Sequence, residues 1–185
     1  MKNVNKPAQP ASKDQLAHSK TVLENFFINS LQEMYYAETE IASEFALIKS
    51  HIVSSKLNEI LKTHFKIHLK HQDRLKKIFE LRNETITSKE CPTFNALLNE
   101  AKNHLAVFSD DLANWEIALI LVSQKLTHYK IATYGGLAHL AIKLDYYKAA
   151  TLLAISVQEE EEYIVNNLNG IIDAFMASHV EGYKN

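Results

Sequence analysis

Residues 27–52, FINSLQEMYYAETEIASEFALIKSHI, repeat apolar side chains at intervals of three and four residues. This spacing places them on one face of a single helix. That face consists of Phe27, Leu31, Met34, Glu38, Ile41, Phe45, Ile48 and Ile52. A carboxylate in an apolar face is costly unless a partner compensates it, so Glu38 indicates a polar site inside a helical core.

Residues 153–175, LAISVQEEEEYIVNNLNGIIDAF, show the same spacing with the same kind of interruption. Four consecutive glutamates, residues 159–162, wrap around the helix, so only one or two can face inward. Glu160 fits the apolar face, Glu159 is the nearest alternative, and Glu161 and Glu162 are expected to face solvent. We therefore expect Glu38 and Glu160 to face each other across a helical bundle, as the inward carboxylates of di-iron bundles do.

The composition favours one all-α domain. The chain has 185 residues, the size of a single domain, and 46% of them are hydrophobic, which is typical of a globular protein. Only four glycines and three prolines occur, which argues for long helices. A net charge of −2 gives no support for nucleic-acid binding, and a single cysteine, Cys91, excludes an internal disulfide and a thiolate metal cluster.

The helical pattern falls into two pairs of long helices with a shorter helix between them. We expect a flexible tail at residues 1–16, a bundle over residues 17–177 and a frayed end at residues 178–185. The helices are expected at about 19–50, 56–82, 93–107, 112–144 and 146–176. Short turns within each pair and a long connection between pairs predict a ferritin-like four-helix bundle of two helical hairpins, with a short extra helix in the crossover.

The same patterns bear on location and partners. The polar N-terminus has no apolar segment typical of a secretory signal, and the longest apolar run, residues 117–122, is too short to cross a bilayer. We therefore expect a cytoplasmic protein without membrane or nucleic-acid partners. We also expect a homodimer, because extra apolar residues lie beside the main faces of the first and third long helices. They are Leu23, Phe26, Ala37, Ala46 and Leu47, and Leu119, Val122, Leu126 and Leu137.

The second long helix carries three histidines, His64, His68 and His71, on its apolar face. Their spacings of four and three residues allow two imidazoles to reach one metal ion. They could equally pair with carboxylates of neighbouring helices. The candidate metal ligands are therefore Glu38, His64, His68, His71 and Glu160, and the candidate cofactor is one divalent ion of iron, zinc or manganese, or none.

The third long helix offers no carboxylate at the same level. Its expected inward face is Ile117, Ile120, Gln124, Thr127, Ile131, Tyr134 and Ala138. Lys130 lies close enough along the helix to reach the layer of Thr127, and His128 is the nearest residue that could bind a metal. This face argues against a two-metal centre.

Two segments resemble the YciE/YciF-type stress proteins, a bacterial branch of the ferritin-like superfamily. They are Tyr36-Ala37-Glu38 and residues 124–135, QKLTHYKIATYG, and the similarity extends over about residues 23–168. The resemblance implies a five-helix ferritin-like domain, usually homodimeric, linked to stress responses and without an established activity. It also implies a carboxylate-rich centre, which Glu38, His64 and Glu160 match.

Other positions depart from that family pattern. Ile67, Thr127 and Lys130 stand where members of the family typically have glutamate, and Ile164 stands near another position that is commonly acidic. Three hypotheses follow. In the first, Lys130 supplies the positive charge of a metal in a non-catalytic bundle. In the second, a single ion binds to the remaining ligands. In the third, a di-iron oxidase or peroxidase works with substituted ligands. The substrate of such an enzyme is not indicated.

Overall fold

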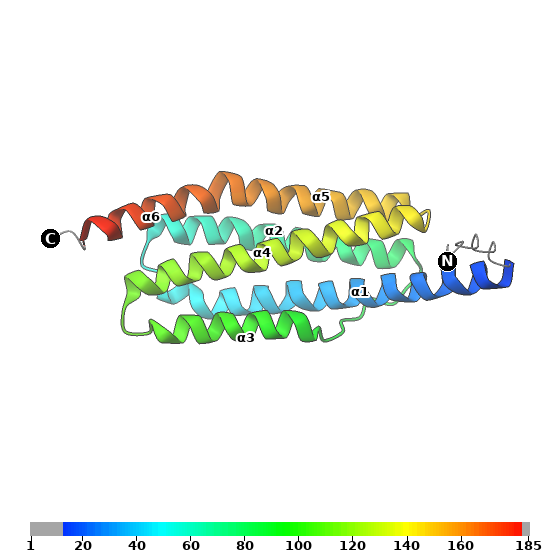
Figure 1. Ribbon diagram of the computed structural model, residues 1–185, viewed down its shortest axis with the longest axis horizontal. Helices are drawn as coiled ribbons and strands as arrows, with labels where there is room; N and C mark the ends of the chain where they lie inside the picture. The colour runs from blue at the N-terminus through cyan, green and yellow to red at the C-terminus, as the bar shows by residue number, and fades with distance from the viewer. Residues whose placement is uncertain (1–12, 183–185) are drawn as a thin grey trace, which may run out of the picture.

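The computed structural model describes residues 13–182, which fold into helices with no β-strand among them (Figure 1). The elements are α1 (Lys13–Ile48), a 3₁₀ turn (Lys49–His51), α2 (Ser55–Leu81), α3 (Pro92–Val107), α4 (Leu112–Lys143), α5 (Tyr147–Tyr163), a π-helix (Ile164–Leu168) and α6 (Asn169–Gly182). The prediction of an all-α fold is confirmed. The first helix begins at Lys13, upstream of the predicted start, and the predicted tails lie partly outside the described residues.

Four rods form the bundle. α1 and α2 are an antiparallel pair, and α4 pairs in the same way with α5 and its continuation (Figure 1). The pairs join because α2 packs on α5 and α1 packs on α4. α3 runs alongside α1 and α4, below both in this view (Figure 1). This arrangement is the predicted pair of hairpins with a short helix in the crossover.

The helix ends follow local sequence signals. The Ser54 hydroxyl accepts a hydrogen bond from the amide of Leu57 at the start of α2, and the Asp111 carboxylate accepts one from Asn114 at the start of α4. At the start of α3, the Cys91 sulfur accepts a bond from the amide of Phe94. Cys91 is thus a buried helix cap.

Within residues 13–182, two residues other than glycine adopt the left-handed backbone conformation, one after each of two long helices. Asn83 has φ 55° and follows α2, and Asp145 has φ 63° and follows α4. Asparagine and aspartate tolerate this conformation better than most side chains. At Asp145 the chain reverses within three residues, and the amide of Tyr146 donates to the carbonyl of Ala141 (2.8 Å). The short turn predicted within the second helix pair is therefore present.

The helix that carries Glu160 is continuous but not uniform. α5, the π-helix and α6 follow one another without a turn and appear as one rod in Figure 1. The π-helix begins at Ile164, one turn after Glu160 and directly after Tyr163. A π-helical segment changes the phase of the residues that follow it, and such segments are frequent at functional sites.

The core has two large apolar parts, one toward each end of the bundle, and a third, smaller apolar cluster lies between α1 and α3. One includes Phe27, Leu31, Met34, Ile78, Phe79 and Leu153. The other includes Leu57, Leu61, Ile120, Leu168 and Ile171. Between them along α1, α2, α4 and α5 lie buried polar side chains, Glu38, His64, His68, His71, Lys130 and Glu160. The space enclosed by α1, α2, α4 and α5 is therefore apolar at both ends and ionic in the middle.

The prediction of which α4 residues face the core is partly wrong, because the buried stripe is rotated around the helix. Thr127, Tyr134 and Ala138 are buried as expected, but Gln124 and Ile131 are only half-buried, and Lys130 is completely buried. The side chain of His128 is exposed. The difference arises because α4 is covered by α1 and α5 on one side and by α3 on another, so its buried surface is wider than one stripe.

The surface that suggested a homodimer is mostly internal. Leu119, Val122 and Leu137 of α4 and Ala37 of α1 are buried within the chain, and Leu126 packs against a cluster that α3 forms with α1. Of the named residues, those that remain exposed are Phe26, Ala46 and Leu47. None of the helices in residues 13–182 combines the length and the apolar character needed to cross a membrane.

One buried carboxylate, Glu116, fixes the turn between α1 and α2. Its Oε1 atom accepts hydrogen bonds from the amides of Val53 (2.6 Å) and Ser54 (2.7 Å), although Glu116 belongs to α4. The sequence periodicity did not single out this residue, since it lies beside the expected apolar face. It ties the first hairpin to the second at one end of the bundle.

We expect Glu116→Ala to lower the free energy of unfolding by about 2–4 kcal/mol, because two amides lose a charged acceptor. Glu116→Gln keeps one acceptor oxygen and should cost less. Urea denaturation followed by circular dichroism measures both changes. A loss below about 0.5 kcal/mol for Glu116→Ala, the range of ordinary surface substitutions, would contradict this role.

Candidate functional site

Four helices contribute one polar group or more to the middle of the bundle. α1 provides Glu38, α2 provides the three histidines, α4 provides Lys130, and α5 provides Glu160. The side chains of Glu38, Lys130 and Glu160 are completely buried, and those of the histidines are nearly so. All five residues predicted as candidate ligands therefore meet in one layer, and Lys130 joins them.

Lys130 lies between the two carboxylates. Its Nζ atom is 3.0 Å from Oε1 of Glu38 and 2.5 Å from Oε1 of Glu160. The expectation that Glu38 and Glu160 face each other across the core is confirmed. Because an ammonium group has three donors and no acceptor, it suits a position between two carboxylate oxygens. The ammonium thus bridges α1 and α5 from α4.

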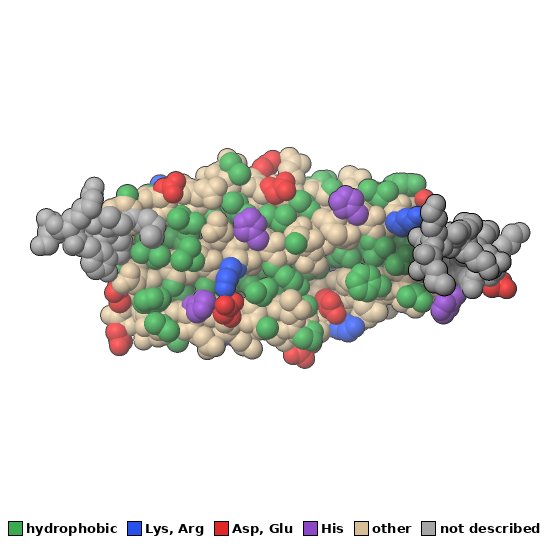
Figure 2. Space-filling model, in the orientation of Figure 1, with side chains coloured by type: hydrophobic (Ala, Val, Ile, Leu, Met, Phe, Trp, Pro, Cys, Tyr) green, Lys and Arg blue, Asp and Glu red, His purple; other side chains and the backbone are tan. Residues whose placement is uncertain are grey.

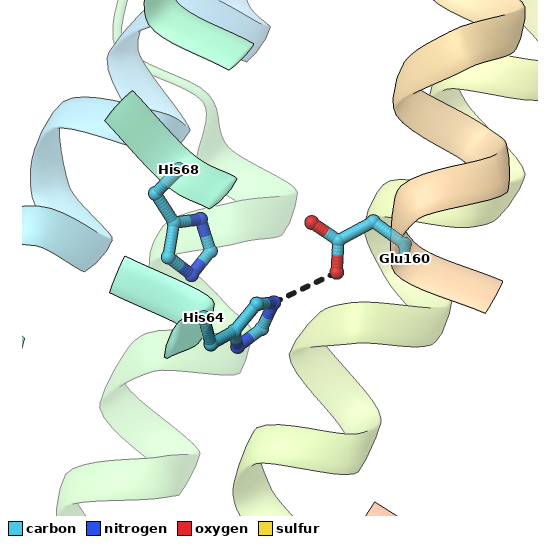
Figure 3. Close-up of side chains that lie close together, drawn as sticks. All are labelled: His64, His68 and Glu160. Carbon is cyan, nitrogen blue, oxygen red and sulfur yellow. Dashed lines mark hydrogen bonds and ion pairs between the residues drawn. The ribbon is translucent and has the colours of Figure 1, made fainter. Parts of the chain in front are cut away.

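His64 and His68 engage the outer oxygens of the same carboxylates. Nε2 of His64 is 2.8 Å from Oε2 of Glu160, the contact drawn in Figure 3. Nδ1 of His68 is 2.6 Å from Oε2 of Glu38 and 2.8 Å from Nζ of Lys130. That nitrogen donates to Glu38 in one tautomer and accepts from Lys130 in the other. Each carboxylate is therefore contacted on both oxygens.

His71 connects the buried pair to the outside of the bundle. Its Nδ1 atom is 3.1 Å from Oε1 of Glu38 and 3.3 Å from Oε1 of Glu160, and its Nε2 atom is 3.2 Å from Oε2 of Glu159. The Glu159 side chain is 21% exposed and is held by two hydrogen bonds from Arg74, of 2.6 and 2.8 Å. Glu159, the alternative to Glu160 in the sequence, thus forms the outer edge of the same network.

Two tyrosines complete the layer in different ways. The Tyr134 hydroxyl donates to Oε1 of Glu38 over 2.7 Å, as expected for a tyrosine beside a buried carboxylate. The Tyr163 ring stacks on His64, with centroids 3.8 Å apart and planes at 17°. Its buried hydroxyl has no hydrogen-bond partner among the described residues. The other tyrosines near the layer have different partners: Tyr35 packs on Phe79, Tyr36 donates a hydrogen bond to Asn95, and Tyr129 contacts Cys91.

The electrostatics favour charged carboxylates at Glu38 and Glu160 and neutral imidazoles at His64 and His68. Burial raises the pKa of Glu38 and Glu160, but the charge of Lys130 and contacts with histidines outweigh burial and hold both pKa values below the usual range. Burial also lowers the pKa of His64, and burial together with the charge of Lys130 lowers the pKa of His68 to about 3. The layer therefore contains two carboxylates around one ammonium.

In the part of the chain that the structure describes, two sets of three side chains have the donor atoms that a metal ion needs. They are His64, His68 and Glu160, and Glu38, His71 and Glu160, with the donor atoms of each set within 4.8 Å of one another. The ammonium of Lys130, however, touches Glu160 and also contacts His68 and Glu38. Two unit charges of like sign 4 Å apart repel by about 4 kcal/mol at an effective dielectric constant of 20, and a dication doubles this. The residues present therefore do not fit an ion between the two carboxylates.

The side chains at the positions that depart from the family pattern pack or form hydrogen bonds outside the network of carboxylates. The Thr127 hydroxyl donates to the backbone carbonyl of Ser123 within its own helix. Ile67 and Ile164 pack in the apolar part of the core beside the layer. These three residues supply apolar or locally bonded side chains where the resemblance implied acidic ones. Arg74 was not identified as a functional candidate, although its place one turn after His71 puts it on the same side of α2.

Known proteins are similar to this chain over most of its length. A family model described as a domain of unknown function (DUF892) matches residues 22–180. Protein YciF of Escherichia coli (strain K12) is 30% identical over 155 residues, which cover 80% of this chain and 93% of YciF. The crystal structure of the E. coli stress protein YciF matches with a TM-score of 0.76 and 29% identity, over 84% of this chain and 97% of that one. YcfI of Rhodopseudomonas palustris shares the fold, with a TM-score of 0.75 and 24% identity, over 80% of this chain and 92% of that one.

The lowered pKa of His68 predicts acid sensitivity. The unfolded chain takes up a proton on this residue near its ordinary pKa of 6.5, whereas the folded protein does so only near 3. The free energy of unfolding should therefore fall as pH decreases from about 6.5 to 4, by on the order of 3 kcal/mol for His68 alone. At pH values below the ordinary pKa of glutamate, 4.5, the unfolded chain also takes up protons on Glu38 and Glu160, whereas the folded protein keeps both carboxylates charged. This difference should add to the loss of stability.

Urea denaturation at several pH values measures this slope. His68→Gln should flatten it between pH 6.5 and 4, whereas His104→Gln should leave it unchanged because the His104 side chain is 51% exposed on α3. Equal slopes in the parent and in His68→Gln would show that His68 is not kept neutral by the fold.

Proposed function

The chain belongs to the family described as a domain of unknown function (DUF892), and we propose that it is a stress-associated structural module in which a lysine replaces a metal ion. The family membership confirms the resemblance to the YciE/YciF-type stress proteins. The association with stress rests on the relative YciF, which is described as a stress protein. The lysine is Lys130, and its contact with both buried carboxylates carries the proposal.

The first support is the charge of the layer. Glu38 and Glu160 each need a positive partner, because an isolated charge is costly to bury. Lys130 supplies that charge from the centre of the layer, where its ammonium contacts one oxygen of each carboxylate. In this view the three histidines and Tyr134 satisfy the remaining lone pairs of the two carboxylates, which a buried ion pair requires.

The second support is the set of ligands. A di-iron centre in a bundle uses a glutamate from each of two helices and a Glu-x-x-His motif from each of the other two. Here α4 contributes Lys130 and Thr127 to the layer, and α2 contributes histidines without a glutamate among them. The hypotheses of a di-iron oxidase and of a single-ion site are therefore not favoured, and a non-catalytic bundle remains.

We propose that the protein works as a homodimer. Apolar side chains remain exposed on α1 and α4, including Phe26 (60%), Leu47 (67%), Leu121 (50%) and Ile142 (51%). Figure 2 shows many apolar and few charged side chains on the face along which α4 runs. An apolar face of this kind is typical of an interaction surface.

The contribution of Lys130 can be measured directly. Lys130→Met keeps most of the side-chain volume but leaves two buried carboxylates without their cation, which should lower the free energy of unfolding by about 3–5 kcal/mol. Lys125→Met is the matched control, since the Lys125 side chain is 53% exposed in a surface ion pair with Glu100. The control should change stability by less than about 1 kcal/mol.

Metal content provides the complementary test. After incubation with ferrous iron, zinc and manganese, the parent protein, purified without a chelating tag, should hold well under one equivalent of metal. Thr127→Glu combined with Lys130→Glu should gain affinity that the parent lacks, because both changes restore carboxylates to the layer. One tightly bound equivalent in the parent, with a mild effect of Lys130→Met, would contradict the proposal and favour a single-ion site.

The dimer is tested by light scattering at micromolar concentration. The parent should have about twice the chain mass of 21.1 kDa. If the face along α4 is the interface, Leu121→Lys with Ile142→Lys should give the monomer mass, whereas Leu69→Lys on α2 should not. A monomeric parent would exclude the dimer, and a double variant that stays dimeric would exclude this face.

A further inference from the structure

A partly open cavity of about 110 Å³ lies next to the polar layer, between α1, α2, α3 and α4. Its walls are mainly apolar and include Phe45, Leu61, Leu98, Leu105, Leu119 and Val122. Phe45 stacks on Phe65, which also lines the cavity, with ring centroids 5.1 Å apart. An engineered apolar cavity of about 150 Å³ in another protein stays dry and binds benzene or xenon. The present cavity is smaller but open on one side, so it suits a small ligand that extends toward the opening.

Most polar groups around the cavity already have partners, whereas His64 and His68, which also line it, each use one ring nitrogen in the polar layer. The Thr127 hydroxyl donates to the carbonyl of Ser123, and the Ser123 hydroxyl donates to the carbonyl of Leu119, both within α4. The ammonium of Lys130, at the inner end, is held by Glu38 and Glu160. The wall therefore offers a ligand no unpaired charge.

The outer rim is also electrically balanced. Nζ of Lys102 on α3 is 2.6 Å from Oε1 of Glu44 on α1, and these side chains are 51% and 22% exposed. Both residues line the cavity, so the ion pair connects α3 to α1 where the cavity approaches solvent. A charged ligand entering here would lose its hydration and gain no free partner of opposite charge, which is unfavourable.

We propose that this cavity binds a small, uncharged and mostly apolar molecule, such as a short-chain alcohol. The apolar walls would supply the binding energy, and the absence of a free charge in the lining would exclude acids and amines of the same length. The apolar walls carry the binding argument, and only the exclusion of acids rests on the pairing of Lys130 with Glu38 and Glu160.

Two probes of equal chain length test the proposal with the full-length protein at pH 7.5. They are 1-hexanol and hexanoate, titrated while methyl groups are observed by NMR. We expect 1-hexanol to give saturable shifts at Leu61, Leu98 and Leu105 but not at Ile78, which lies in the other part of the core. Hexanoate should bind at least tenfold more weakly.

Two substitutions on α3 provide a matched pair. Ala101 lines the cavity, whereas Ala106 is exposed on the same helix. Ala101→Leu should fill the cavity and weaken 1-hexanol binding at least tenfold, and Ala106→Leu should change it by less than twofold. Leu105→Ala enlarges the cavity and tests the same point without adding volume. It should improve binding of 1-octanol relative to 1-hexanol at least threefold.

The proposal is overturned if 1-hexanol gives no saturable shifts, or if the shifts lie outside the cavity. Equal binding of hexanoate would overturn the argument from charge. Retained binding in a folded Ala101→Leu variant, or an unchanged preference between the alcohols in Leu105→Ala, would show that the probes bind elsewhere.

Discussion

Two carboxylates buried in the middle of a helical bundle must have positive charge beside them, and the rest of the structure accommodates that requirement. Glu38 and Glu160 come from helices at opposite ends of the sequence and are completely buried. Lys130 contacts both, so the ammonium joins α1, α4 and α5 at one point. The three histidines of α2 complete the layer by occupying the remaining carboxylate lone pairs.

This ionic layer also explains how the interior is divided. Apolar clusters fill the bundle on either side of it and could, by themselves, tolerate a shift of one helix along another. A buried polar group that must meet one particular partner restricts such shifts, as buried polar residues do in coiled coils. We therefore regard the layer as a determinant of helix alignment, with Glu116 fixing the turn at one end of the bundle.

The sequence predicted the helices and the inward carboxylates because both depend on local periodicity. It also identified Lys130 as able to reach the layer. It did not predict the phase of α4, where Gln124 is half-buried and Lys130 fully buried, because the buried width of a helix depends on its neighbours. The docking of α3 against α1 and α4 buries Ala37 and partly buries Leu126, and only tertiary structure reveals that contact. For the same reason the cavity beside the layer has no sequence signature.

The central claim is that an ammonium group occupies the place between Glu38 and Glu160. Anomalous diffraction from crystals grown with manganese and ferrous iron tests it most directly. We predict electron density for Nζ of Lys130 against both carboxylates and no anomalous peak between them. A peak at about 2.0–2.2 Å from oxygens of Glu38 and Glu160, with Lys130 displaced, would contradict the account.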